Sequence, residues 1–286
     1  MSNSTLFLTL PLALAGFTFL PACSGGGDSD SSTDTDADTD TDTDTDADSD
    51  TDTDTDTDMP IVYDVSGVAV DFPASTPATE GLCVVAVDPG PALSGGEPTP
   101  LGNTTVAADG TFTIRGLEVK PTLGLVIIVQ DCAGEGTVYP TGTGISSATL
   151  EEIQPGGMLA DRTIFSIGAT FKEGMVGSVA LAGSAWSPDT QGILMGFVLD
   201  GAFAPVGGAT VTGAAATTFY MDTDSSDGLF TVAGATNSST AAGVGVFAIP
   251  AAPITTYTAT ADGLAFDTLT GGSLPGLALF VAFYGS

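Results

Sequence analysis

The sequence predicts an all-β protein, in which two antiparallel β-sandwiches follow a disordered acidic linker. Beyond residue 60 the chain is rich in Gly, Thr, Val, Ala and Phe and poor in Lys, Glu and Arg, as strands and turns usually are. Short apolar or alternating runs recur at roughly even spacing, separated by Gly, Pro, Asp and Asn. A weak internal repeat divides this part into two copies, so we expect one sandwich in each copy.

The N-terminal region ends an apolar run over residues 6–20 with Leu20-Pro21-Ala22-Cys23. The run is shorter than the ~20 apolar residues that cross a bilayer comfortably, and a small residue and a cysteine follow it. This order resembles the lipobox of bacterial lipoproteins. The resemblance implies cleavage before Cys23, lipidation (palmitate) of its sulfur and, because Ser24 follows, a place in the outer membrane. An ordinary signal peptide or a mis-assigned start codon are the alternatives, since residues 1–5 carry no Lys or Arg.

The next segment is an acidic tether. Residues 28–58 contain 15 Asp at nearly every second position and no basic residue. Neighbouring charges lie within a Debye length and repel one another, and the segment has no large apolar side chain to bury. We therefore expect a disordered spacer that reaches up to ~100 Å when taut. A calcium role is disfavoured, because the repeat lacks the Gly-centred turn and closing acid of a calcium loop.

Charge and composition exclude several function classes. The net charge is −31, and the sequence has only four basic residues and no histidine. Nucleic-acid binding is excluded because it depends on Lys and Arg at phosphates, and direct adsorption to anionic lipid is disfavoured. The lack of histidine removes the commonest general base and zinc ligand. We therefore expect no cofactor and no enzymatic activity.

The three cysteines divide into one lipid site and one pair. Lipidation of Cys23 leaves Cys83 and Cys132, both in apolar strand-like runs. In an exported protein an even remainder indicates a disulfide between facing strands, with two buried free thiols as the alternative.

The repeat is visible in two kinds of motif. Its copies begin with Gly67–Asp71 and Gly196–Asp200, and each later has an Asp-Gly turn before an alternating strand, at Asp109–Ile114 and Asp227–Val232. Phe112 and Ile114, and likewise Phe230 and Val232, should point into a core. The other expected strands are Leu82–Val87, Thr104–Ala108, Leu125–Gln130, Ala209–Thr212, Thr217–Met221, Val244–Ile249, Tyr257–Thr260 and Leu277–Tyr284.

The second copy is similar to carboxypeptidase regulatory-like domains, which are prealbumin-like sandwiches related in architecture to the immunoglobulin fold. The matching residues are Gly196–Asp200, Pro205–Val211, Asp227–Phe230 and Tyr257–Gly263. The resemblance implies an accessory, non-catalytic module and brings no catalytic residues. The expected organisation is a signal peptide (1–22), lipidated cysteine and tether (23–59), first sandwich (60–145), connecting segment with a short helix at 178–185 (146–188) and second sandwich (189–286).

Candidate sites in the folded part are weak. Asp222, Asp224 and Asp227 form the best calcium loop, but the Gly comes one position late and no acid closes the loop, so a solvated turn is expected. The adjacent pair Glu151 and Glu152 is read as a surface or helix-start pair, because adjacent strand residues point to opposite faces.

Nucleophilic catalysis has no support in the sequence. No Gly-x-Ser-x-Gly elbow occurs, Lys120 has no serine nearby, and Lys172 has Glu173 beside it as an expected partner.

The scatter of the Tyr and Trp residues bears on what the sandwiches can bind. It argues for core and rim positions over a sugar-binding platform for Tyr63, Tyr139, Trp186, Tyr220, Tyr257 and Tyr284.

The functional expectation is an envelope lipoprotein with a structural or adhesive role that contacts polysaccharide or another envelope protein. A carbohydrate-binding module of the envelope is the alternative. A membrane barrel is disfavoured, because the aromatics are too few for two girdles.

Overall fold

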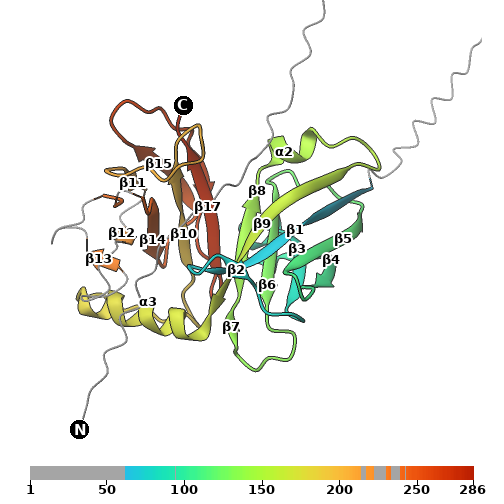
Figure 1. The fold of residues 1–286 in the computed structure, drawn as a ribbon, viewed down its shortest axis with the longest axis horizontal. Coiled ribbons are helices and arrows are strands. Elements are labelled where there is room, and N and C mark those ends of the chain that lie inside the picture. The colour runs from blue at the N-terminus through green and yellow to red at the C-terminus, as the bar shows by residue number, and fades with distance from the viewer. Residues whose placement is uncertain (1–61, 94, 214–216, 222–229, 233–238, 242) are drawn as a thin grey trace, which may run out of the picture. The chain divides into compact units, whose positions relative to one another are not determined.

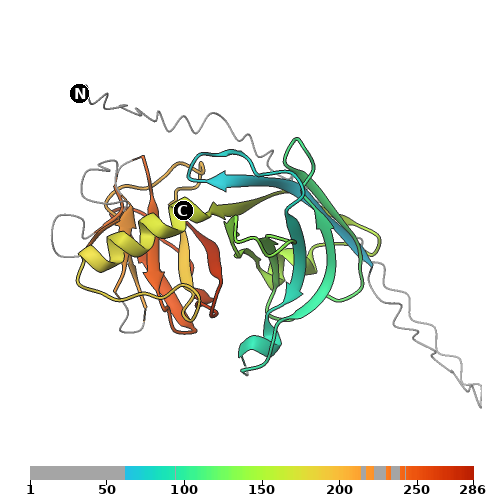
Figure 2. The ribbon, with the colours of Figure 1, turned by 90° about the horizontal axis from the view of Figure 1, so that it is seen from below.

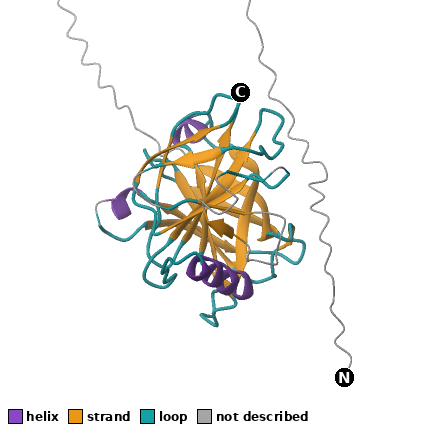
Figure 3. Cartoon of the chain, turned by 90° about the vertical axis from the view of Figure 1, so that its left-hand side faces the viewer, coloured by secondary structure: helices purple, strands orange, loops and turns teal. Residues whose placement is uncertain are grey.

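The computed structural model describes residues 62–93, 95–213, 217–221, 230–232, 239–241 and 243–286, which fall in one compact unit of the chain (Figure 1). Strands in three sheets are the main regular structure of this part, and its helices lie at the margins (Figure 3). The all-β prediction is therefore confirmed. This part has two lobes: the first lobe is residues 62–168 and the second lobe is residues 189–286.

A five-stranded sheet forms one wall of the first lobe. Strand β1 is its centre: it pairs antiparallel with β5 and β2 and parallel with β9, which in turn pairs antiparallel with β7. The members are β1 (Tyr63–Phe72), β2 (Thr76–Pro77), β5 (Thr111–Leu117), β7 (Val138–Tyr139) and β9 (Met158–Gly168).

A nine-stranded sheet runs through both lobes in the order β13-β12-β14-β10-β17-β8-β6-β3-β4. The first lobe supplies β3 (Cys83–Asp88), β4 (Thr99–Thr105), β6 (Leu125–Gln130) and β8 (Thr141–Ile145), and the second lobe supplies β10 (Ile193–Leu199), β12 (Phe219–Met221), β13 (Phe230–Val232), β14 (Val246–Pro250) and β17 (Ala278–Tyr284).

A three-stranded sheet and three helices complete the described part. The small sheet belongs to the second lobe and contains β11 (Thr210–Thr212), β15 (Thr255–Thr260) and β16 (Leu269–Gly271). The helices are α1 (Gly90–Leu93), α2 (Ser147–Glu151) and α3 (Ala169–Leu181). Figure 2 shows α3 lying across the strands of the second lobe.

Each lobe has its own apolar core between two sheets. The first-lobe core is filled by inward side chains such as Val65, Val84 and Ile127, and it includes Phe112 and Ile114 as predicted. The second-lobe core lies between the nine-stranded and three-stranded sheets and centres on Phe247 and Tyr257. Alternation along each strand is what delivers these side chains to one face.

A third core joins the lobes. It lies on the other face of the second-lobe strands, where it is covered by α3 and by the ends of β1 and β9. At its centre the Phe280 ring packs 5.1 Å from Phe72 and 4.7 Å from Phe165, with Phe197 at 6.0 Å. Phe72 also contacts Phe171 edge to face at 5.3 Å. We call these five residues the phenylalanine cluster.

The repeated glycine at the start of each copy has a common structural cause. Gly67 on β1 and Gly196 on β10 each face a parallel neighbour, β9 and β17 respectively. A Cβ at Gly67 would lie 1.8 Å from the Arg162 carbonyl oxygen, and one at Gly196 would lie 2.3 Å from the Val281 carbonyl oxygen. Only glycine permits so close a backbone approach, so the repeat marks the first strand of each lobe.

The segment expected to connect the copies, residues 146–188, contains a major strand instead. Strand β9 pairs in parallel along most of β1, and Ile164 on it is fully buried in the first-lobe core. The alternation that would have revealed this strand is interrupted at Asp161 (φ 58°) and Arg162, where the pairing register shifts. A bulge of this kind breaks the period-two pattern on which strand prediction depends.

The helix in this segment begins earlier than expected. The sequence predicted residues 178–185, whereas α3 runs from Ala169 to Leu181 and ends before Gly183, whose φ is 76°. Gly174 and Gly177 lie inside it, although glycine weakens helices. Burial of Met175 and Val179 in the joining core supplies the stability that propensity does not.

We predict that Phe280→Ala lowers the free energy of unfolding by ~3–5 kcal/mol and uncouples the two lobes. The Phe280 side chain is 1% exposed and touches residues from both lobes. Scanning calorimetry of the full chain should then show two transitions in place of one.

The matched control is Phe283→Ala on the same strand. Phe283 is 2% exposed but packs only in the second-lobe core, 5.8 Å from Phe247. This variant should lose stability while keeping a single transition. Identical calorimetric profiles for the two variants would contradict the role assigned to the cluster.

Candidate functional site

Several predicted sites fall on residues that the structure does not describe. These are the lipidation site Cys23, the Asp-rich tether, and the calcium candidates Asp222, Asp224 and Asp227. They remain predictions from the sequence.

The predicted disulfide is present. Cys83 and Cys132 are bonded, with their Cα atoms 5.2 Å apart. The bridge ties the first residue of β3 to the turn that follows β6, and these two strands are neighbours in the nine-stranded sheet. A closed covalent loop at the end of a strand pair is a structural feature, and its presence fits an oxidising compartment.

Most of the Tyr and Trp side chains are used in packing, as expected. Tyr63, Tyr139, Tyr220 and Tyr257 are at most 4% exposed. All four hydroxyls donate to backbone carbonyls, for example Tyr63 to Val119 at 2.8 Å, and the Tyr220 hydroxyl also accepts from the Val211 amide at 2.8 Å. Burial raises the pKa of Tyr63 to about 12 and raises that of the other three as well. These rings are therefore not a sugar-binding platform.

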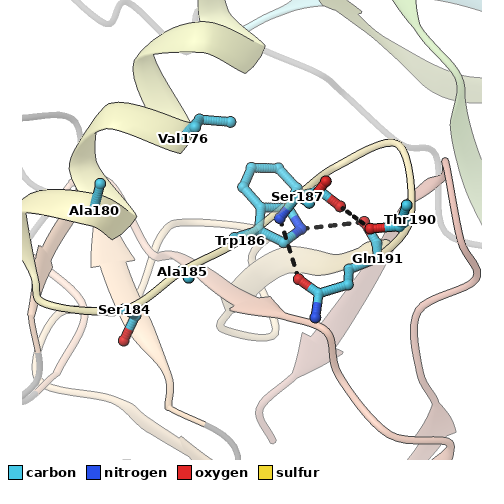
Figure 4. A pocket seen from close by; sticks show the side chains of 8 residues that line it. All are labelled: Val176, Ala180, Ser184, Ala185, Trp186, Ser187, Thr190 and Gln191. Atoms are coloured by element: carbon cyan, nitrogen blue, oxygen red, sulfur yellow. Dashed lines mark hydrogen bonds between the residues drawn. The ribbon is translucent and has the colours of Figure 1, made fainter.

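The single tryptophan organises a loop beside α3. Trp186 is 6% exposed, and its indole N–H donates to the Gln191 and Gly192 carbonyls at 3.2 and 3.1 Å. Its ring meets Tyr139 edge to face at 6.4 Å. Figure 4 shows the hollow next to it, about 450 Å³ in volume and lined by Val176, Ala180, Ser184, Ala185, Trp186, Ser187, Thr190 and Gln191. None of these lining side chains is ionisable, so the hollow offers no acid or base.

The candidate carboxylates and lysines are spread over the surface. Glu151 is the last residue of α2 and Glu152 is its C-cap, and both are exposed. They are a surface pair, at the end of a helix rather than its start. Lys120 donates from its ammonium to the Ile153 carbonyl.

The partner expected for Lys172 was wrong. Its ammonium lies 3.9 Å from an Asp189 carboxylate oxygen and 5.6 Å from the centre of the Tyr139 ring, where it makes a cation–π contact. Glu173 is the next residue on α3, and adjacent helical residues do not face each other. Lys172 is thus part of the packing around the joining core.

Two further features of the described residues concern metal binding and membrane crossing. Nowhere among them do three or more Cys, Asp or Glu side chains converge as metal ligands would. The helices of the described part are all too short or too polar to traverse a bilayer.

One pair of exposed aromatic rings was missed by sequence reasoning. Among the described aromatic side chains, Phe203 and Tyr284 are the ones largely exposed, at 41% and 53%. Their rings meet edge to face with centroids 5.6 Å apart. Tyr284 was expected on a terminal strand and does lie at the end of β17, but Phe203 was not singled out. The sequence feature that could have indicated its exposure is a bulky apolar residue inside the turn-forming sequence 200–205.

Comparison with known proteins identifies no family. No family model and no curated protein matches the chain. Among solved structures it resembles the shaft pilin SpaA of Lactobacillus rhamnosus GG, with 11% identity, a TM-score of 0.25, and coverage of 79% of this chain and 98% of that one.

Two further structures resemble the chain to a similar degree. The TIE protein of Bacillus anthracis has 12% identity and a TM-score of 0.25, and the match covers 79% of this chain and 34% of that one. The minor pilin GBS52 of Streptococcus agalactiae has 9% identity and a TM-score of 0.22, with coverage of 78% and 95%. Likenesses this weak do not bear on function.

Removing the disulfide should lower the stability of the fold without unfolding the protein. The bridge spans 49 residues, for which chain entropy gives ~4 kcal/mol of stabilisation. We predict that the double variant Cys83→Ala with Cys132→Ala loses about that much in denaturant unfolding. A loss below ~1 kcal/mol would show that the strand pair needs no covalent closure.

Proposed function

We propose that this protein is an exported, lipid-anchored, non-enzymatic protein of the cell envelope that displays a two-lobed β-sandwich body in a structural or adhesive role. Cys23 carries the lipid, and the outer membrane is its location. The self-repelling Asp-rich tether holds the body away from the bilayer. Envelope polysaccharide or another envelope protein is the partner, and nucleic acid is not.

The observation that carries the proposal is the structural role of the aromatic side chains in the folded body. Buried tyrosines, the tryptophan and the phenylalanine cluster are committed to packing and to joining the lobes. The sheet that runs through both lobes and the closing disulfide add rigidity of the kind a display module needs. The disulfide also supports export. The sequence has no histidine to supply a general base.

A second candidate function is carbohydrate binding. The observation that favours it is the exposed pair Phe203 and Tyr284, because exposed aromatic rings are the usual apolar element of a binding surface.

The anchoring is tested by mass spectrometry of the mature N-terminus after expression in a lipoprotein-processing bacterium. We expect a chain that begins at Cys23 and carries acyl groups, since the cysteine sulfur is the lipid acceptor in this scheme. Protease shaving of intact cells reports, in the same sample, whether the body is surface-exposed.

The matched control is Cys23→Ser, which should leave the N-terminal leader uncut and abolish acylation. An unlipidated wild-type N-terminus downstream of residue 23 would reject the anchor.

A further inference from the structure

We propose that the Phe203–Tyr284 pair is a binding site for a neutral glycan, with Phe203 and Tyr284 as the stacking rings. The site rests on the proposed adhesive function, because it names the surface and the ligand class through which the body would bind.

The turn that carries Phe203 holds this ring in place. Phe203 has φ of 62°, a left-handed conformation that is unusual for a bulky residue. One carboxylate oxygen of Asp200 accepts from the Ala202 and Ala204 amides at 2.9 Å, and the Asp200 amide donates to the Ala204 carbonyl at 2.9 Å. The turn is therefore fixed by its own hydrogen bonds. Strained backbone conformations of this kind cluster at active sites and ligand-binding sites.

Tyr284 comes from a different element and is also fixed. It is the last residue of β17 and lies opposite Leu199 of β10 in the parallel pairing. The Gly285 amide, next along the chain, donates to the Leu199 carbonyl at 2.8 Å. Two rings 5.6 Å apart, one on a tight turn and one on a strand end, thus form a preorganised edge-to-face pair.

Tyr284 also brings a polar group to the pair. Its hydroxyl can both donate and accept a hydrogen bond, so it would serve as a partner for a sugar hydroxyl beside the rings.

The size of the apolar patch favours a sugar over a protein partner. A stable protein interface buries about 800 Å² on each side, far more than two side chains provide. The other strongly exposed apolar side chains, such as Leu181 on α3 and Met158 on β9, belong to other elements. The C–H face of a pyranose matches one or two aromatic rings in area, and it packs against their negative π faces.

Charge favours a neutral glycan over an acidic one. The chain has 35 acidic residues against four basic ones, so its field opposes polyanions.

The test is retention of the full mature chain in affinity gels that contain neutral glucans, mannans, galactans or β-linked N-acetylglucosamine polymers. Gels with alginate serve as the acidic comparison. We expect retention by at least one neutral glycan, and a loss of ~10-fold or more in affinity with Tyr284→Ala, as when an aromatic stacking partner is removed.

Matched variants separate binding from folding. Phe203→Asn keeps a residue that tolerates the left-handed conformation while removing the ring, so it should lose binding with its unfolding midpoint retained. Tyr284→Phe keeps the ring and should retain most of the affinity. Leu181→Ala removes an apolar side chain that is 79% exposed on α3, and it should change nothing.

The site is overturned if no neutral glycan retains the wild-type chain, if only alginate does, or if Tyr284→Ala and Phe203→Asn bind as well as the wild type. Binding to a purified envelope protein in the absence of glycan binding also overturns it. These outcomes leave the anchoring proposal intact, whereas an unlipidated N-terminus would reject anchoring even if glycans bind.

Discussion

The structure depends above all on where strand β17 lies. It pairs in parallel with β10 of the second lobe on one side and with β8 of the first lobe on the other. Its Phe280 side chain enters the phenylalanine cluster, while Phe283 on the opposite face enters the second-lobe core. The backbone hydrogen bonds of β17 to β8 and the burial of Phe280 therefore act along the same strand, and both require the two lobes to be folded against each other.

The junction between the lobes also determines which aromatic side chains remain exposed on the surface. The joining core takes up Trp186 and Tyr139, and the lobe cores take up Tyr63, Tyr220 and Tyr257. The end of β17 then presents Tyr284 beside the turn that follows β10, because β10 and β17 pair in parallel within the second lobe. A surface built on a strand end and a hydrogen-bonded turn has little freedom to lose on binding, which suits recognition by a few side chains.

The sequence was informative where local patterns decide the structure. Alternation placed Phe112 and Ile114 in the core, the count of cysteines paired Cys83 with Cys132, and apolar runs located most strands. Sequence prediction failed where contacts between distant segments determine the structure.

The bulge at Asp161 interrupts the alternating pattern of β9, so this strand was not predicted. Helix α3 is stabilised by a core whose other members lie far along the chain. The sequence showed that Gly67 and Gly196 repeat, but it did not show why. The cause is the close approach of a parallel neighbouring strand at each glycine, which only the strand pairing reveals. Phe203 was overlooked because exposure is a property of the assembled surface.

The most direct measurement of the central claim is native-state hydrogen exchange at the β8–β17 junction. The reporter is the Ala278 amide, which donates to the Pro140 carbonyl at 2.9 Å across the junction. If the lobes form one cooperative body, this amide exchanges with the same free energy as amides in the middle of β6 and β14. Exchange of Ala278 at a much lower free energy, while those amides stay protected, would show that the lobes open independently and would contradict the account.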